Sequence, residues 1–388
     1  MPQFEALDYY EIEDLLTEEE RLVRDTVRSF VTEKVLPIIA HHNREGTFPV
    51  ELIPEMAELG LLGANLKGYG CAGLNHVAYG LIMRELERGD SGLRSFISVQ
   101  GSLVMFPIHR FGSEEQKAAW LPRLAKGEAI GCFGLTEPDF GSNPSGMTTR
   151  AVRKGNRWVL NGTKMWITNG SIADVALIWA RERDQVRGFL VEKGAKGLSA
   201  REVPNKFSLR ASVTSEMVLQ DCEIPYENLL PETRGLKSAL DCLDQARYGI
   251  AWGVIGSAMA VFDEALRYAK SRVQFDRPIA GFQLVQRKLV WMVQEITKGQ
   301  MLCWRLGKLK ESGRATSAQV SLAKRNNVAM ALEIARLARD ILGASGITDE
   351  YQTGRHLCNL ESVITYEGTH DIHTLIVGQD ITGISAFK

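Results

Sequence analysis

The spacing of the apolar residues changes twice along this sequence, and this change limits the fold more than any other feature. Before about residue 130, apolar residues such as Val23, Val27 and Val31 recur every three or four positions, as on one face of a helix. Short β-rich runs follow, separated by turns such as Asn161-Gly162. From about residue 235 the helical spacing returns. We therefore predict an α+β chain, with helical domains at 1–129 and 235–388 and an antiparallel β-sheet or small barrel at 130–234.

Short local signals predict where several helices begin and end. Thr17 and Glu20 form a capping box, with a hydroxyl and a carboxylate three residues apart. Pro37 is expected to stop the helix that begins there. In the last domain, breaks in the helical pattern are expected at Pro278, Gly313, Gly343–Gly346 and Gly368.

The composition argues against several classes of protein. The net charge of −1 gives no electrostatic reason to expect nucleic acid or an anionic membrane as a partner. The longest nearly uncharged run, Tyr248–Phe262, is shorter than the ~20 residues of a membrane span, so we expect a core helix. No dinucleotide-binding or P-loop motif occurs, and six scattered cysteines indicate reduced thiols and no zinc site. The acidic N-terminus resembles no targeting peptide, so we expect a cytoplasmic protein, or a mitochondrial matrix protein if the sequence is a processed form.

The segment Thr365–His373 (TYEGTHDIH) concentrates polar side chains. Two histidines flank Asp371 at a ligand-like spacing, but no further ligands complete a metal site. Glu367 is a candidate general base, since apolar neighbours such as Tyr366 can desolvate its carboxylate and raise its pKa. The segment can also be only a polar helix start, capped by Thr369 or Asp371. These nine residues alone leave the last two interpretations open.

Other stretches are weak signals by themselves. Trp166 and Thr168 are expected on one face of a strand, which suits stacking beside a planar cofactor, although such a tryptophan is often simply core. Arg272 follows a helix, where an arginine is most often solvated or capping. Glu87 and Arg94 are seven residues apart, and a solvated ion pair is the default interpretation.

Taken together, four motifs resemble those of the acyl-CoA dehydrogenase family, and the resemblance runs from near Thr17 to Phe387. They are Gly134–Pro138 with Gly141-Ser142, Trp166–Thr168, Arg272–Phe275 and Tyr366–Thr369. The resemblance implies a helical domain, a middle β-domain and a C-terminal four-helix bundle. Within the family the chain most resembles decarboxylating glutaryl-CoA dehydrogenases, through Arg94-Ser95, Ser98–Ser102, Phe207–Ser212, Ala246–Ile250 and Tyr366–His373.

The resemblance implies roles for individual residues. Glu367 would be the catalytic base for the α-proton of an acyl-CoA thioester, and FAD would accept the β-hydride. Arg272 and Gln283 would reach the FAD of a neighbouring subunit. The implied cofactor-binding residues are Phe133, Leu135, Thr136, Gly141, Ser142, Trp166, Thr168, Arg272, Phe275, Gln283, Asp340, Leu342, Gly343, Ala344, Thr369 and Phe387.

The resemblance also implies a substrate with a distal carboxylate, because a buried Arg94 guanidinium requires an anionic partner. Tyr366 would mark the decarboxylating enzymes. The implied substrate-binding residues are Arg94, Ser95, Ser98 and Glu87 around the carboxylate, and Ser142, Leu240, Arg247, Tyr366 and Gly368 along the rest of the acyl-CoA.

The expected reaction is oxidation of glutaryl-CoA and its decarboxylation to crotonyl-CoA and CO2. Electrons would pass to an electron-transfer flavoprotein, and the enzyme would be a homotetramer without a metal ion. Three alternatives stay open at this stage. They are a dehydrogenase for another short acyl chain, a glutaryl enzyme that does not decarboxylate, and a non-catalytic binding protein with this fold.

Overall fold

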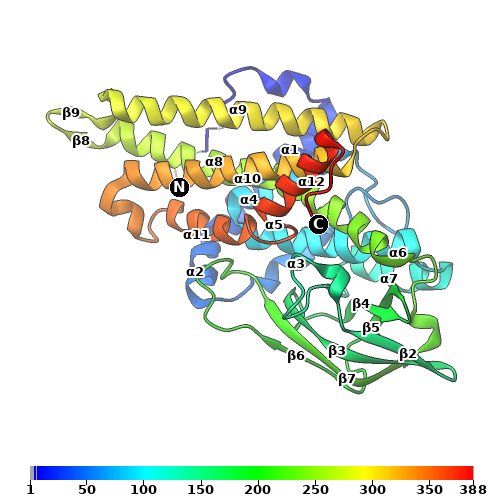
Figure 1. Ribbon diagram of the computed structural model, residues 1–388. Coiled ribbons are helices and arrows are strands. Elements are labelled where there is room, and N and C mark those ends of the chain that lie inside the picture. Colours follow the sequence, from blue (N-terminus) through cyan, green and yellow to red (C-terminus); the bar gives the residue numbers. More distant parts are fainter. Residues whose placement is uncertain (1–3, 6, 388) are drawn as a thin grey trace.

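The computed structural model describes residues 4, 5 and 7–387. Helices from both parts of the chain form one layer, and a β-sheet from the middle of the chain lies against one side of it (Figure 1). This arrangement confirms the predicted order of helices, strands and helices. The helices that precede the sheet are α1 Glu18–Phe30, α2 Leu36–Glu45, α3 Ile53–Glu58, α4 His76–Gly89, α5 Ser91–Ser98, α6 Phe106–Phe111 and α7 Glu114–Ala125.

The predicted capping box of the first helix is present, but its predicted end is wrong. Thr17 Oγ1 accepts the Glu20 amide at 3.2 Å, and the Glu20 carboxylate accepts the Thr17 amide at 2.8 Å. Pro37 does not stop the helix, because a π-helical stretch, Val31–Val35, leads directly from α1 into α2. Pro37 is the second residue of α2, directly after this π-helical stretch, and the chain continues as a helix beyond it.

The sheet of the middle domain is mixed rather than purely antiparallel. Its order is β1-β4-β2-β3-β7-β6, and β5 also pairs with β4. Strand β1 runs parallel to β4, with Cys132 opposite Ala176, while the hairpin and meander pairs are antiparallel as predicted. The long connection between β1 and β4 permits their parallel pairing. The strands are β1 Gly131–Gly134, β2 Arg150–Lys154, β3 Arg157–Thr168, β4 Val175–Glu182, β5 Gln185–Glu192, β6 Leu198–Glu202 and β7 Thr214–Pro225.

The last part of the chain is helical, with the predicted breaks. Three long helices pack on one another, and α4 from the first part of the chain packs against two of them, α8 and α9. A small hairpin of β8 Val273–Gln274 and β9 Arg277–Pro278 separates α8 from α9. The helices are α8 Gly235–Ser271, α9 Gln283–Glu311, α10 Ser317–Leu342, α11 Thr353–Val363 and α12 His370–Thr382.

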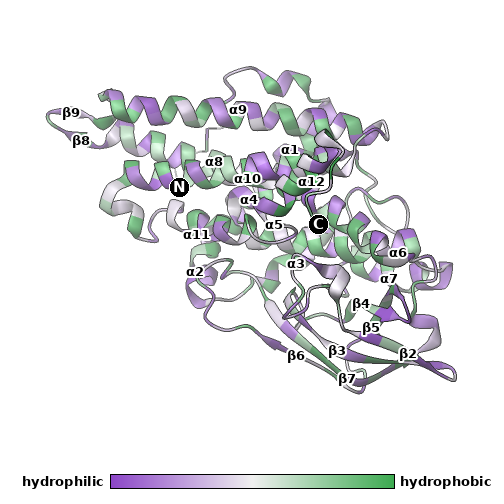
Figure 2. Ribbon diagram, in the orientation of Figure 1, coloured by the Kyte–Doolittle hydropathy of each residue, from purple (hydrophilic) through white to green (hydrophobic). Residues whose placement is uncertain are grey.

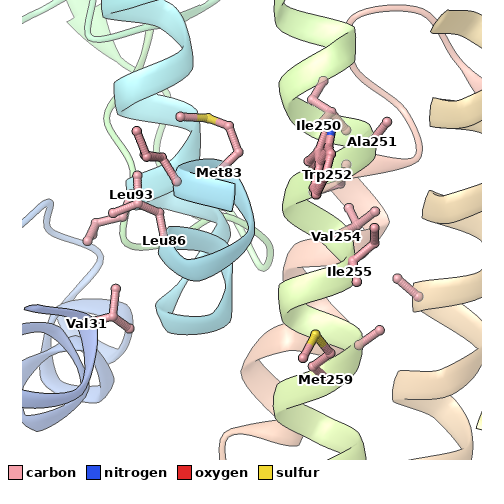
Figure 3. Close-up of a cluster of buried hydrophobic side chains, with 14 of the residues drawn as sticks. Val31, Met83, Leu86, Leu93, Ile250, Ala251, Trp252, Val254, Ile255 and Met259 are labelled. Carbon is pink, nitrogen blue, oxygen red and sulfur yellow. The ribbon is translucent and has the colours of Figure 1, made fainter. Parts of the chain in front are cut away.

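Helix α8 is the core helix that the sequence predicted. Every residue from Tyr248 to Phe262 is buried. Figure 3 shows part of this core between α4, which contributes Met83 and Leu86, and α8, which contributes Trp252 and Ile255. By length and composition α8 could cross a membrane, but 89% of its most apolar stretch is buried inside the molecule. Its apolar surface therefore belongs to the core that joins both helical parts of the chain.

Asp90 joins three parts of the chain at the corner between α4 and α5. Its Oδ2 accepts Arg355 Nε at 3.0 Å and Asn359 Nδ2 at 2.9 Å. The Oδ1 of Asn359 in turn accepts the amide of Leu209, from the β-domain, at 2.9 Å. A loop of the sheet domain is thereby fixed against the helices, next to the helix that carries Arg94.

Candidate active site

The candidate base, Glu367, lies in the short loop between α11 and α12. The backbone φ is 52° at Glu367 and 95° at Gly368. A left-handed backbone is unfavourable for a residue with a side chain and persists where the surroundings enforce it. Thr369 then caps α12, because its Oγ1 accepts the Ile372 amide at 3.2 Å. Of the two predicted caps, Thr369 is therefore the one used.

Two cationic side chains hold this loop. Arg247 of α8 donates from Nε to the Glu367 carbonyl at 2.8 Å. Lys324 of α10 donates from Nζ to the Tyr366 and Gly368 carbonyls at 2.5 and 2.7 Å. Three successive carbonyl groups are thus bound by side chains from two different helices, which accounts for the left-handed turn.

The Glu367 side chain differs from a carboxylate that is fully hydrogen-bonded. Its Oε2 is buried and has no hydrogen-bond partner among the residues that the structure describes. Burial raises the pKa of Glu367, while the charges of Arg94, Lys324 and Arg247 oppose the increase. A buried carboxylate with an unused oxygen and a raised pKa can take a proton from a ligand placed against it.

Arg94 approaches the same loop from α5. It donates from Nε to Glu87 Oε2 at 2.6 Å and from Nη2 to the Tyr366 hydroxyl. Both members of the Arg94–Glu87 pair are completely buried. Burial alone would lower the pKa of Arg94, but Glu87, Tyr366 and Glu367 raise it above its usual value. The Nη1 atom is buried without a partner in the described part of the chain.

The interpretation of Glu87 and Arg94 as a solvated ion pair is therefore wrong. The chain breaks at Asp90 between α4 and α5, and this corner brings the two side chains together. Helix α8 makes room for them, since a Cβ at Gly253 would lie 2.2 Å from Glu87 Oε2. A spacing of seven residues cannot show which groups a third helix places around the pair.

A serine that the sequence did not single out orients the pair. Ser91 Oγ donates to Glu87 Oε1 at 2.9 Å. The sequence predicted Ser95 and Ser98 for this role, and both are buried. Ser98 Oγ has no hydrogen-bond partner within the described residues. The second oxygen of Glu87 is thus held by a serine at the corner between α4 and α5.

The histidines of the segment lie at the start of α12, as expected of a polar helix start, but one of them is buried. His373 is 1% exposed. A Cβ at Gly368 would lie 2.9 Å from His373 Nε2, so glycine is required beneath the loop as well as for its φ. Burial, with the charges of Lys324 and Arg247, lowers the pKa of His373 to about 2. Among the described residues, no three His, Cys, Asp or Glu side chains are grouped to hold a metal ion.

The predicted flavin face of the sheet is exposed. Trp166 is 59% exposed, so its interpretation as a core residue is wrong. Its φ of 64° interrupts the pairing of β3 with β7 between Lys164 and Ile167. The Thr136 carbonyl accepts the Met165 amide at 2.9 Å, which brings the Thr136 loop beside this strand. An exposed indole beside a hydroxyl-bearing loop fits a flat aromatic ligand.

The other residues predicted at this face differ in exposure. Phe133 and Leu135 are buried in the core between the sheet and the helices. Thr168 is partly exposed, and Gly141 and Ser142 are exposed. The loop therefore offers mainly backbone and small side chains to a ligand.

A buried ion pair fixes the base of this loop. Lys164 Nζ donates to Glu137 Oε1 at 2.9 Å and to the Leu135 carbonyl at 3.1 Å. The amides of Thr148 and Thr149 donate to the Glu137 carboxylate at 2.7 and 2.9 Å. Burial alone would raise the pKa of Glu137, but these bonds lower it to about 2, whereas burial lowers the pKa of Lys164 to about 8.

A second group of predicted cofactor residues lies around the β8–β9 hairpin. Phe275, Gln283 and Asp340 line a groove of about 660 Å³, and Phe275 is 89% exposed. In Figure 1 this hairpin lies at the end of the helical layer that is farthest from the sheet. The hairpin and strand β3 thus lie in different parts of the chain's fold. The remaining predicted residues are buried Leu342 and exposed Arg272, Gly343, Ala344 and Phe387.

A second groove, of about 480 Å³, lies where α8 begins. Ser145, Arg181 and Arg234 are among its lining residues. Leu240, which was predicted to hold the acyl-CoA arm, follows on α8 and is 36% exposed. Arg247, which was predicted for the same arm, is buried and donates to the Glu367 carbonyl of the base loop.

Lys324 is the functional residue that sequence reasoning missed most clearly. It lies on the buried face of α10 and is 1% exposed. The available signal was its place in the apolar stripe Val320, Ala323, Val328 and Ala331, where a lysine breaks the pattern.

Comparison with known proteins covers nearly the whole chain. Residues 17–128 match the N-terminal domain of acyl-CoA dehydrogenases, residues 132–222 the middle domain and residues 233–382 the C-terminal domain. A solved glutaryl-CoA dehydrogenase from Mycobacterium smegmatis is 56% identical, with a TM-score of 0.98 over 100% of both chains. A glutaryl-CoA dehydrogenase from the same organism, solved in complex with FADH2, is 52% identical, with a TM-score of 0.98 over 100% of both chains. The mitochondrial short-chain specific acyl-CoA dehydrogenase of Rattus norvegicus is 35% identical over 369 residues, which are 93% of this chain and 90% of that protein.

Proposed function

The chain belongs to the acyl-CoA dehydrogenase family and uses FAD, and from this premise we propose that it oxidises glutaryl-CoA and decarboxylates the product to crotonyl-CoA and CO2. The family, its fold and its cofactor are confirmed as predicted. The acyl chain and the loss of CO2 are the proposal. The observation that carries it is the buried, unpaired Nη1 of Arg94 beside the loop of Glu367.

A carboxylate at the far end of the acyl chain would complete the bonding of Arg94. Its Nε and Nη2 already donate to Glu87 and Tyr366, and Nη1 is left. Leaving a buried donor unpaired costs roughly 1–3 kcal/mol, and more at a charged group. Glutaryl-CoA supplies an anion for this donor, whereas butyryl-CoA does not. The 56% identity to a protein named glutaryl-CoA dehydrogenase supports the same choice.

The oxidation begins at Glu367. Its carboxylate takes the proton from the α-carbon of the thioester, and its raised pKa makes it basic enough for this task. The Glu367 amide is available to the developing enolate oxygen, because the left-handed turn is fixed through the neighbouring carbonyls. FAD, when bound, accepts the hydride from the β-carbon.

The residues on the page fit FAD at two places. Exposed Trp166 beside Thr136 provides a flat face for an aromatic ring. The groove with Phe275 and Gln283 would hold the nucleotide half of the FAD of a neighbouring subunit, which agrees with the place of the β8–β9 hairpin away from the sheet in Figure 1.

Decarboxylation follows from the chemistry of the oxidised product. In glutaconyl-CoA the double bond between the α- and β-carbons conjugates the γ-carbon with the thioester carbonyl. The C–C bond between the γ-carbon and the carboxylate can therefore break. CO2 leaves, and its electron pair stays in a dienolate conjugated with the thioester. Protonated Glu367 then returns its proton to the γ-carbon, which gives crotonyl-CoA. The Tyr366 hydroxyl, which accepts from Arg94, would lie beside the departing carboxylate.

A dehydrogenase for a short unsubstituted acyl chain is the alternative. The similarity to the short-chain specific enzyme of Rattus norvegicus favours it. It leaves Arg94 Nη1 without a partner in the complex, and for that reason we prefer the dicarboxylic substrate.

The partners follow from the same site. Arg181 of β4 and Arg234, the residue before α8, would meet the phosphates of CoA. Along α9, on the upper side of the helical layer in Figure 2, hydrophobic residues are interspersed with hydrophilic ones, and Leu284 and Val290 are 71% and 64% exposed. This face would join subunits of a homotetramer. An electron-transfer flavoprotein as acceptor and a cytoplasmic location remain predictions.

The test is incubation of the purified flavoprotein with glutaryl-CoA and an artificial electron acceptor. We expect acceptor reduction with equal amounts of CO2 and crotonyl-CoA. If the acceptor is reduced and glutaconyl-CoA accumulates, glutaryl-CoA is the substrate but the enzyme does not decarboxylate it. Activity with butyryl-CoA but not with glutaryl-CoA would establish the alternative.

A further inference from the structure

Lys324 is buried in the helical core although no carboxylate bonds to it. It is 1% exposed, and its ammonium donates to the Tyr366 and Gly368 carbonyls. None of the ion pairs in the described part of the chain includes it. Burying an ammonium without a counter-ion in contact is costly, and an apolar residue could fill the same space. Packing alone therefore does not account for a lysine here.

We propose that Lys324 is a positioning residue for proton abstraction by Glu367. Its ammonium holds the carbonyls before and after Glu367 and so keeps that residue in its left-handed conformation, with a φ of 52°. Arg247 binds the carbonyl between them and cannot fix the other two. This inference rests on Glu367 being the base, as proposed above, but not on the identity of the acyl chain.

The charge of Lys324 has a second effect, on the ionisation of Glu367. Burial disfavours the carboxylate, and Lys324 is one of three cations that oppose this. Burial also lowers the pKa of Lys324 to about 7, while Glu367 raises it and Arg247 and Arg94 lower it further. Removing the lysine should therefore raise the pKa of Glu367. The charged or titratable groups that face Lys324 are Tyr366, Glu367, Arg247, Arg94, His370 and His373.

Three variants of the flavin-loaded enzyme test the proposal. Lys324→Met keeps the unbranched stem of the side chain, one atom shorter, without charge or N–H donors, and Lys324→Arg keeps both the charge and the donors. Arg325→Gln is the matched control, because it removes one positive charge from the next position of α10, where Arg325 bonds Thr374 at 2.7 Å. For each variant we would measure flavin content, Tm, and kcat and KM against pH with the best acyl-CoA substrate of the wild type.

We expect Lys324→Met to lower kcat on the order of 10²-fold, as a misplaced reacting group does. KM should change much less than kcat, because the interaction acts on the base and not on the substrate. The acid-side pKa of kcat/KM should rise by about one unit, which is the loss of one favourable charge. Lys324→Arg should recover part of both effects, and Arg325→Gln should resemble the wild type.

A flavin-loaded Lys324→Met enzyme with wild-type kcat and pH profile overturns the proposal. If this variant does not retain flavin, Lys324→Gln, which keeps two N–H donors without the charge, decides through its pH profile. An unshifted acid side then contradicts the electrostatic role. Failure of the proposed substrate is a separate outcome, since wild-type activity on butyryl-CoA alone leaves the Lys324 comparison intact.

Discussion

Two glutamates with a lysine nearby, buried Glu137 in the β-domain and half-buried Glu367 at the candidate active site, are bonded in opposite ways. Glu137 contacts Lys164 at 2.9 Å, and both of its oxygens accept hydrogen bonds. Glu367 has an unpartnered Oε2 in the described structure, and Lys324 bonds the backbone instead of the carboxylate. The pKa of Glu137 is lowered to about 2, whereas burial raises the pKa of Glu367.

The difference separates a structural carboxylate from a reactive one. Every hydrogen bond to Glu137 stabilises its charge, so it stays ionised and has no oxygen left for a ligand. At Glu367 the helices supply positive charge at a distance but no donor to one oxygen. These cations stabilise the negative charge of Glu367, and its Oε2 remains free to accept a proton from the substrate. Changing each glutamate in turn should therefore affect different properties of the enzyme.

The largest expected effect is on catalysis. Glu367→Gln should keep FAD and acyl-CoA binding and lose activity on the order of 10⁴-fold, the upper range for a general base. Single-turnover flavin reduction measures this directly. Glu361→Gln, on the preceding helix, is the control and should be unaffected, since Glu361 pairs with Arg336 on the surface. Wild-type flavin reduction by Glu367→Gln would show that another group is the base.

A change at Arg94 tests whether the distal carboxylate of the substrate is the missing partner of this guanidinium. Arg94→Ala removes the partner of the distal carboxylate and leaves Glu87 buried without its cation. We expect kcat/KM for glutaryl-CoA to fall by about 10²–10³-fold, as when a buried charged hydrogen bond is truncated. Butyryl-CoA, which has no distal carboxylate, serves as the internal control and should lose much less. Equal losses on both substrates would contradict the carboxylate-binding role and indicate general damage to the site.

A change at Glu137 tests the structural ion pair between Glu137 and Lys164. Glu137→Gln should destabilise the protein by about 3 kcal/mol, because it leaves the Lys164 charge buried without its partner. The folded pKa of about 2 lies below the ordinary 4.5, so the stabilisation is present above pH 4.5 and is lost as the pH falls toward 2. Denaturant unfolding against pH measures both statements. Exposed Glu114, which pairs with Lys117, is the control for a surface pair, and a Glu137→Gln variant no less stable than Glu114→Gln would contradict this assignment.

The sequence predicted the parts of this comparison that depend on spacing and residue type. Helical and strand periods gave the order of the elements. An acid among apolar neighbours made Glu367 a candidate base, and the resemblance of four motifs to a known family selected it. Spacing could not reveal that Pro37 is absorbed by a π-helical turn, or that Trp166 adopts a left-handed backbone and becomes exposed. Both depend on packing that is decided elsewhere in the chain.

The sequence was least informative where one helix acts on another. Glu87 and Arg94 became a buried pair because Gly253 of α8 leaves space for them. Arg247 and Lys324 reach the base loop across 120 and 42 residues of sequence, respectively. The motif around Arg247 indicated the acyl-CoA arm and not this loop, and Lys324 lies in no motif. A lysine within an apolar helical stripe was the one local sign, and only the fold shows which carbonyl groups it meets.

The smallest expected effect is on the stability of Glu367→Gln, and it is opposite in sign to the effect of Glu137→Gln. Because the folded pKa of Glu367 is raised, its ionised form is disfavoured by folding, and any contribution to stability is present below pH 4.5 and lost as the pH rises through the folded pKa. Glu367→Gln should therefore be slightly more stable than the wild type at neutral pH, by less than Glu137→Gln loses, and the two should converge in acid. Tm measured on flavin-loaded protein across this pH range tests it. A lower Tm for Glu367→Gln at neutral pH would mean that the charges of Arg94, Lys324 and Arg247 outweigh burial. The ionised Glu367 carboxylate would then stabilise the fold, as the Glu137 carboxylate does.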